Sequence, residues 1–203
     1  MLWGGHSGGL ELRKRASGAL ALHGRFPYNK RAVLSDGGRT GRPRKEVIAP
    51  RAFAYRVERP EEDIHFLVGH SYDRPLASRG AGTLDLIDTA DALSFVATIT
   101  LEMQQVSYVA DFLAGFYAGL IIGLSPGFRI PPERTVEDAE TVEEEDPEEG
   151  TALIRTVHHA LLYEISAVTR PAYDETQLEA RNWAPAAAST DPALARSLQR
   201  WRL

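Results

Sequence analysis

Alternation of apolar and polar residues is the strongest pattern in this 203-residue chain. It is clearest over residues 93–101, where every second side chain from Leu93 to Leu101 is apolar and most of those between are polar, as in a strand with one buried face. Further strands are predicted at residues 10–26, 46–48, 63–68, 118–128 and 151–168. Gly18 and Gly24 are expected to break the segment at 10–26, and the segment at 151–168 is expected to form one bent strand or two.

A helical period replaces the alternation at residues 102–117. Apolar side chains recur there at the spacing of one helix face, and Gly119 follows as a helix stop; they are Val106, Val109, Leu113 and Phe116. A turn of helix is expected within residues 49–59, and a short helix at 174–181. Because the strands do not alternate regularly with helices, the pattern predicts an α+β, mostly-β domain rather than a doubly wound sheet.

Three segments have the composition of turns or loops. Residues 27–43 are rich in turn formers, and Arg74-Pro75 is expected to turn the chain after a strand. Residues 133–150 are strongly acidic, with nine Asp or Glu residues from Glu137 to Glu149. Like-charge repulsion and the scarcity of apolar residues predict that this acidic segment is a solvated, mobile loop.

Composition fits one soluble domain, with 43% hydrophobic and 25% charged residues. We expect the domain at residues 10–182, after a flexible start at 1–9 and before a tail at 183–203. The absence of cysteine excludes disulfides, thiolate metal sites and cysteine nucleophiles. No secretory signal is apparent, and the longest apolar stretch, 112–124, is too short to span a bilayer, so we expect an intracellular protein without a membrane partner.

Charge is divided unevenly along the chain, although the net charge is only −5. Residues 1–60 carry 13 Lys or Arg and 4 Asp or Glu, whereas the remainder carries 10 and 24. A basic segment of this kind can bind nucleic acid or an acidic protein partner. Its basic residues are scattered through predicted loops and lack interleaved aromatic residues, so the pattern does not favour nucleic acid.

Ser125 is the first candidate for chemistry. It follows an apolar run and lies between Gly123 and Gly127, with Pro126 directly after it. These neighbours allow a sharp turn or a close approach to another chain, and they stiffen the backbone. A nucleophile on a rigid, exposed backbone is one reason for such a segment. An ordinary turn at the end of a strand is another, and the segment alone favours the turn.

The chain has six histidines, of which His70 is the best candidate for a general base. It is predicted where a strand enters a polar turn, a position accessible to substrate. His65 alternates with apolar residues inside a strand, which is typical of a structural role. His158 and His159 would point to opposite faces of a strand and could not bind one ion together, so no metal site is predicted.

Glu164 stands alone among apolar residues of its predicted strand. A buried carboxylate is costly unless it is paired, so an ion pair with Arg129 or Arg155 is one expectation. Another follows from the order His70, Ser125, Glu164. These residues supply a base, a nucleophile and an acidic group that orients the base, as hydrolysis by a serine requires.

Four stretches carry a resemblance to a known family. They are residues 46–53 (EVIAPRAF), 66–70 (FLVGH), 123–128 (GLSPGF) and 163–172 (YEISAVTRPA). In this order and at this spacing they resemble the prohead (maturation) proteases of tailed phages, which are related in fold to herpesvirus assemblins. The resemblance covers about residues 10–180. In that family the first stretch usually reads Pro-Gly-Ala-Phe, so Arg51 replaces a glycine, and Asn and Asp commonly flank the histidine in place of Gly69 and Ser71.

The resemblance implies a serine endopeptidase with Ser125 as nucleophile and His70 as base. It also implies an assemblin-like β-barrel or sheet core with a central helix and a short C-terminal helix, and no cofactor. The expected partners are the major capsid protein and its scaffold segment. We expect the chain to cleave them inside the immature capsid, in the cytoplasm of the host cell. The dimers of the assemblins also suggest that this chain pairs with a second copy of itself. Since assemblins use a second histidine, His158 competes with Glu164 for the third catalytic position, and the flanking residues favour Glu164.

Two other functions remain open from the sequence. A capsid-assembly protein could keep this fold for scaffold contacts without cleaving, and residues 1–60 could form a nucleic-acid-binding module. The protease interpretation requires His70 within hydrogen-bonding reach of Ser125. It also requires an oxyanion site that does not use Pro126, which has no N–H; the amides of Ser125, Gly127 or another loop are the candidates.

Overall fold

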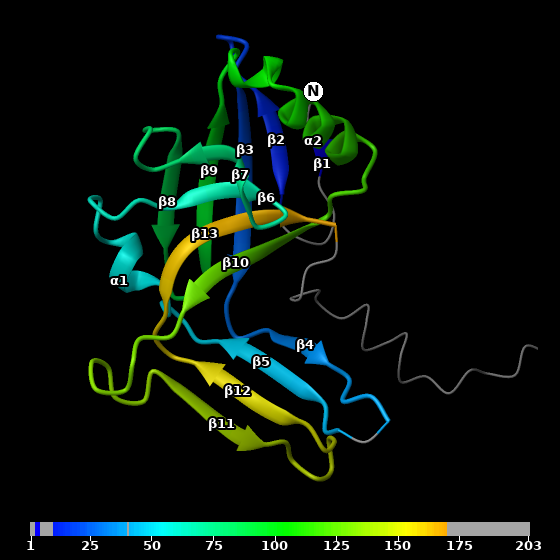
Figure 1. The fold of residues 1–203 in the computed structure, drawn as a ribbon, viewed down its shortest axis with the longest axis vertical. Helices are drawn as coiled ribbons and strands as arrows, with labels where there is room; N and C mark the ends of the chain where they lie inside the picture. The colour runs from blue at the N-terminus through cyan, green and yellow to red at the C-terminus, as the bar shows by residue number, and fades with distance from the viewer. Residues whose placement is uncertain (1–2, 5–9, 40, 170–203) are drawn as a thin grey trace, which may run out of the picture.

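Residues 3–4, 10–39 and 41–169 are described by the computed structural model, and they form three open β-sheets with two short α-helices (Figure 1). The α+β, mostly-β class predicted from the sequence is confirmed. The helix expected at 174–181, the tail at 183–203 and most of the start at 1–9 lie outside the described residues.

The five-stranded sheet is antiparallel throughout, in the order β1-β2-β3-β9-β8. Along β9 every second residue from Leu93 to Ile99 is buried, as the alternation predicts. Gly24 lies inside β3 and does not break it, because its missing side chain makes room for the ring of Phe95 on the neighbouring strand. The strands are β1 (Trp3–Gly4), β2 (Glu11–Lys14), β3 (Leu20–Pro27), β8 (Leu84–Asp88) and β9 (Ala92–Ile99).

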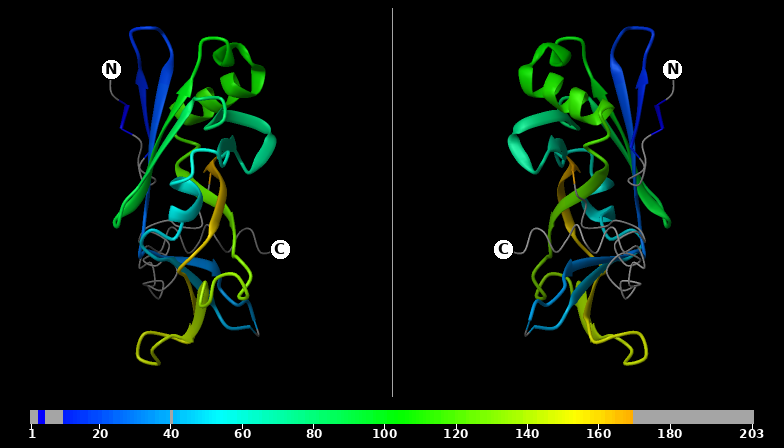
Figure 2. Two further views of the ribbon diagram at one scale, coloured as in Figure 1. Left: turned by 90° about the vertical axis from the view of Figure 1, so that its left-hand side faces the viewer. Right: turned by 90° about the vertical axis from the view of Figure 1, so that its right-hand side faces the viewer.

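The central sheet has the order β10-β13-β6-β7, with β13 and β6 parallel and the other pairs antiparallel. Its strands are β10 (Gly123–Arg129), β13 (Leu161–Val168), β6 (His65–Val68) and β7 (Ser71–Ser78). One of its faces packs on the five-stranded sheet, as Figure 2 shows from the side. The rings of Phe66 on β6 and Phe95 on β9 meet there with centroids 4.9 Å apart, and both belong to the same buried core.

The predicted helix at residues 102–117 is present as a 3-10 turn, η1 (Met103–Gln105), followed by α2 (Ser107–Tyr117). Val109, Phe112 and Phe116 bury its apolar face, and Gly119 ends it with a φ of 70°. The turn of helix expected near residue 55 is α1 (Ala54–Val57). Neither helix of the described segments combines the length and the apolar character needed to cross a bilayer.

The lower sheet of Figure 1 corrects two predictions. Its order is β11-β12-β5-β4, with strands β4 (Arg31–Ser35), β5 (Arg44–Ile48), β11 (Glu140–Glu144) and β12 (Leu153–Val157). The expected loop at 27–43 therefore contains an edge strand, and so does the expected acidic loop at 133–150. The segment at 151–168 forms two strands, β12 and β13, which belong to different sheets.

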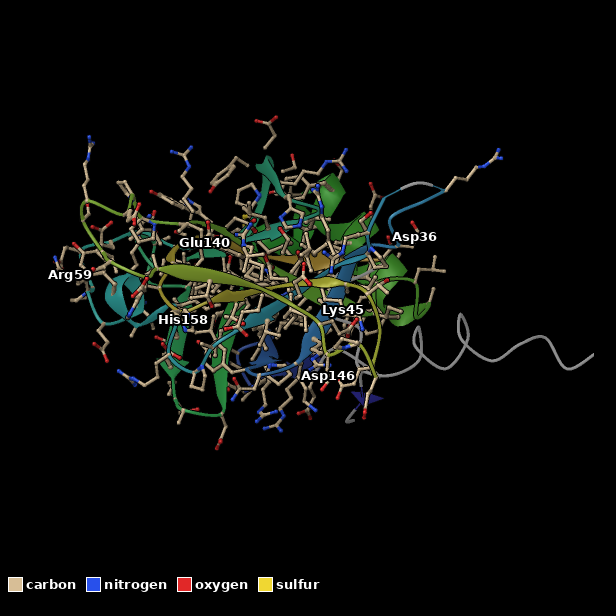
Figure 3. The ribbon with its side chains drawn as sticks, turned by 90° about the horizontal axis from the view of Figure 1, so that it is seen from below. Asp36, Lys45, Arg59, Glu140, Asp146 and His158 are labelled. Atoms are coloured by element: carbon tan, nitrogen blue, oxygen red, sulfur yellow. The ribbon has the colours of Figure 1, made fainter. Side chains whose placement is uncertain are left out.

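Ion pairs explain why the acidic segment forms a strand beside basic neighbours. Arg42 contacts Glu144 and Arg31 contacts Glu149, each at 2.8 Å, so the basic and acidic parts of the sequence meet across this sheet. In Figure 3, which views the molecule from below, Lys45 and Asp146 lie toward one end of the sheet and Glu140 and His158 toward the other. The uneven charge along the chain is thus partly neutralised within the fold, which weakens the nucleic-acid interpretation.

Glu145 anchors the end of the acidic segment. Its side chain is 2% exposed; Oε1 accepts a hydrogen bond from Lys45 Nζ at 2.6 Å, and Oε2 accepts one from the amide of Ala152 at 3.1 Å. The hydrogen bond from Lys45 holds the pKa of Glu145 below its ordinary value of 4.5, assisted by the Ala152 amide and by Arg31. A depressed carboxyl pKa stabilises the fold above that ordinary value, and the contribution is lost as pH falls through the folded-state value.

We therefore expect Glu145→Gln to lower the free energy of unfolding by about 1–2 kcal/mol at pH 7, since it removes a charged, buried hydrogen-bond acceptor. The difference from wild type should shrink as pH is lowered below 4.5. Urea unfolding at several pH values measures both effects. Glu143→Gln is the matched control, because Glu143 is exposed on β11, two residues before Glu145; an equal effect in both variants would show that Glu145 has no special role.

Candidate active site

The register of the central sheet places the candidate nucleophile beside the candidate acid. Strand β10 lies at the sheet edge and pairs antiparallel with β13, so that Ser125 is opposite Ser166 and Gly127 is opposite Glu164. Because residues two apart on a strand share a face, Ser125 and Glu164 lie on the same face of neighbouring strands. The reading of Ser125 as part of an ordinary turn is wrong, since it lies inside β10.

His70 reaches the same region from a tight turn between β6 and β7. Val68 pairs with Ser71, and the two residues between them, Gly69 and His70, have φ values of 59° and 62°. Positive φ at both central positions is the hallmark of a type I′ hairpin turn. The turn expected at Arg74-Pro75 is therefore misplaced; those residues lie within β7, an edge strand, where a proline need not remove a ladder hydrogen bond.

A short hydrogen bond joins His70 to Glu164. The Nδ1 atom of His70 lies 2.7 Å from Oε1 of Glu164, and Oε2 of the same carboxylate accepts a hydrogen bond from Ser166 Oγ at 2.7 Å. Glu164 is 4% exposed, so its burial is compensated by these two contacts and not by Arg129 or Arg155. With the carboxylate as acceptor, Nδ1 carries the ring proton and Nε2 is left with a lone pair.

The side chains of His70 and Ser125 open into one pocket. The pocket has a volume of about 460 Å³ and a mostly aliphatic wall. Its lining consists of Val68, Gly69, His70, Ile121, Ser125, Ala167, Val168 and Thr169. No hydrogen bond joins Ser125 to His70 among the described residues. The reach that the protease interpretation requires is therefore not seen, although both residues line this pocket. Such contacts are often long before substrate binds.

Gly127 is required by the buried carboxylate. A Cβ atom at this position would lie 1.8 Å from Oε1 of Glu164, far inside van der Waals contact. The glycine after Ser125-Pro126 thus allows a close approach between β10 and β13 of the same chain.

The other histidines of the described residues lie outside the pocket. His158 follows β12 in a bend, so the strand geometry assumed for it is wrong, and its Nε2 lies 3.0 Å from Thr141 Oγ1 of the lower sheet. His65 on β6 contacts Asp63 at 3.5 Å and packs its ring against Tyr72. Among residues 3–4, 10–39 and 41–169, no three His, Asp or Glu side chains gather closely enough to hold a metal ion.

The backbone amides of the His70 turn are already engaged. The N–H of Gly69 donates to the carbonyl of Ala167, and the N–H of His70 donates to Ser166 Oγ. An oxyanion formed near Ser125 therefore needs other donors, and Pro126 supplies none. The amides of Ser125 and Gly127 remain the candidates within β10, as the sequence predicts.

The family model of the caudovirus prohead serine proteases matches residues 34–189, a range that contains His70, Ser125 and Glu164. The chain belongs to this family. Membership confirms the resemblance found in the four sequence stretches and indicates a serine peptidase of capsid maturation. It also indicates an association with capsid components, inside the procapsid in the host cell. No curated protein and no solved structure gave a significant match to the chain.

One departure from the family pattern has a structural counterpart. Arg51, which stands where these proteases usually have glycine, adopts a φ of 60°, a left-handed conformation that favours glycine. Its guanidinium donates to the carbonyl of Asp88 at 3.1 Å and forms an ion pair with Glu58. These contacts hold Arg51 in a conformation that an arginine rarely adopts.

Proposed function

We propose that this chain is a serine endopeptidase that cleaves the scaffold and capsid proteins during prohead maturation, with Ser125 as nucleophile, His70 as general base and Glu164 as the acid that orients His70. The observation that carries the proposal is the 2.7 Å contact between His70 Nδ1 and Glu164 Oε1 at the edge of a pocket that also contains Ser125. Membership of the prohead protease family supports the substrate class.

The proposed roles of these three residues account for each proton transfer of acylation and deacylation. Nε2 of His70 takes the Ser125 hydroxyl proton as Oγ attacks the peptide carbonyl, and Glu164 stabilises the resulting imidazolium through Nδ1–H. The same proton passes to the leaving amine as the peptide C–N bond breaks and an acyl-enzyme forms. A water molecule, deprotonated by His70, then hydrolyses the ester and restores Ser125.

A non-catalytic capsid-assembly protein of the same family is the second candidate. The observation in its favour is that Ser125 Oγ makes no hydrogen bond to His70 among the residues described. A nucleophile and base that never came together would leave only a binding surface on this fold. The two functions therefore differ in whether Ser125 reacts.

Co-expression of the full chain with its neighbouring capsid gene decides between them. We expect the capsid protein to be trimmed by wild type, to remain full length with Ser125→Ala, and to be trimmed normally with Ser94→Ala, a matched change on β9 away from the pocket. A fluorophosphonate probe should modify wild-type protein at Ser125, seen by peptide mass spectrometry. Identical, uncleaved capsid protein with wild type and Ser125→Ala would reject the protease function.

A further inference from the structure

The buried hydroxyl of Ser166 contacts both His70 and Glu164. We propose that Ser166 is a positioning residue that holds these two side chains in the orientation needed for reaction. The effect of Ser166 on catalysis rests on the proposed protease function. Ser166 is 0% exposed. Its Oγ lies 2.7 Å from Oε2 of Glu164 and 2.9 Å from the backbone nitrogen of His70.

The direction of these two hydrogen bonds follows from the chemistry of the partners. The backbone N–H of His70 can only donate, so Ser166 Oγ accepts from it and turns its own proton toward the carboxylate. Glu164 then accepts from Ser166 through Oε2 and from His70 Nδ1 through Oε1. A carboxylate held from both sides keeps one orientation, and that orientation leaves Nε2 of His70 unprotonated and directed away from Glu164.

Ser166 also holds the backbone of His70 in an unfavourable conformation. His70 has a φ of 62°, which is unfavourable for a residue other than glycine. The hydrogen bond from its N–H to Ser166 ties this turn to β13. Because Ser166 is also the cross-strand partner of Ser125, a single residue contacts the base, its acid and the strand of the nucleophile.

The charged groups around His70 determine how its ring titrates, and this titration can measure the positioning role of Ser166. Glu164 is the one titratable group bonded to its ring among the described residues. The other titratable side chains on the strands around it are His65 on β6, Tyr72, Asp73 and Arg74 on β7, Arg129 at the end of β10, and Tyr163 on β13. A carboxylate that loses the Ser166 donor holds the imidazolium proton more tightly.

The first measurement is the titration of the His70 ring by NMR of histidine-labelled full-length protein, assigned with His70→Gln. We expect Ser166→Ala to move the His70 midpoint upward by about one pH unit, whereas Glu164→Gln moves it downward. The double variant should behave as Glu164→Gln alone, because Ser166 acts through the carboxylate. Ser94→Ala, a serine change on β9, should leave the midpoint where it is in wild type.

The second measurement is the rate at which the fluorophosphonate probe modifies Ser125. We expect Ser166→Ala to lower it by about tenfold to hundredfold, the effect of removing one hydrogen bond to a charged group. If Ser166→Ala does not fold, Ser166→Cys replaces it, since the thiol keeps a weak donor at nearly the same position; the same changes are expected with smaller amplitude.

The two readouts separate the two proposals. A His70 midpoint that is unchanged in the folded Ser166 variant, or that shifts equally in the presence and absence of Glu164, would overturn the positioning role. A wild-type protein that is not modified at Ser125 would reject the protease function, while the titration still decides the role of Ser166.

Discussion

Replacing Glu164 with glutamine should lower the rate of capsid cleavage, and of fluorophosphonate modification at Ser125, by about a thousandfold to ten-thousandfold. The amide has nearly the shape of the carboxylate but carries no charge to stabilise the His70 imidazolium. Its NH₂ group can also donate to Nδ1, which would place the ring proton on Nε2 and remove the base. The effect on stability should be small beside the effect on the rate, since the amide keeps nearly the same shape and can still hydrogen-bond to His70 and Ser166.

Glu46→Gln is the matched control for this prediction. Glu46 is also a buried strand carboxylate, with its Oε2 3.4 Å from Arg155 Nε, but it lies on β5 of the lower sheet. The same chemical change there should leave the reaction rate within about twofold of wild type. Full activity in Glu164→Gln, measured in a folded protein, would mean that another group orients His70.

A methyl group at position 127 should lower the reaction rate almost as much as the loss of the Glu164 charge. In Gly127→Ala the new Cβ would lie 1.8 Å from Oε1 of Glu164, the oxygen that His70 contacts. The carboxylate must move or β10 must shift away from β13, and either change displaces Ser125 relative to His70. A displacement of about 1 Å can cost a hundredfold in rate, so we expect at least that loss per folded molecule.

Gly24→Ala separates this local effect from general damage to a sheet. Its Cβ would also clash, at 2.2 Å from the ring of Phe95, but in β3 and away from the pocket. We expect it to lower the unfolding temperature while the folded fraction reacts with the probe at the wild-type rate. If Gly127→Ala lost only stability and kept its rate per folded molecule, the close approach of β10 to Glu164 would have no catalytic role.

The strands predicted correctly are those that a local sequence pattern specifies. The alternation from Leu93 to Ile99 yields β9 because each apolar residue gains the same buried face, whichever strand lies beside it. The strands that the sequence missed include β4 and β11, the two edge strands of the lower sheet. Each pairs with the next strand along the chain, but the two hairpins join only through the parallel pairing of β5 with β12 and contacts such as that of Arg42 with Glu144, 102 residues apart. A local pattern contains no information about such a distant partner.

The candidate site divides in the same way. The order His70, Ser125, Glu164 and the four family stretches were readable from the chain. Ser166 was missed, although its place two residues after Glu164, on the same strand face, is a signal that could have found it. Its importance was not readable, because a hydroxyl in an apolar strand gains its meaning from the amide of His70, which is 96 residues away.

By itself, the sequence determined the mostly-β class, the family and the residue types available for chemistry, since these depend on composition, local periodicity and short motifs. The tertiary structure decided which of those residues meet. It made His70 a partner of Glu164 and left His158 with Thr141. It also showed that Gly127 is a glycine because a carboxylate occupies the space of its side chain. The physical reason is that both choices depend on strand register across β10, β13 and the turn after β6, and that register forms only when the sheet is complete.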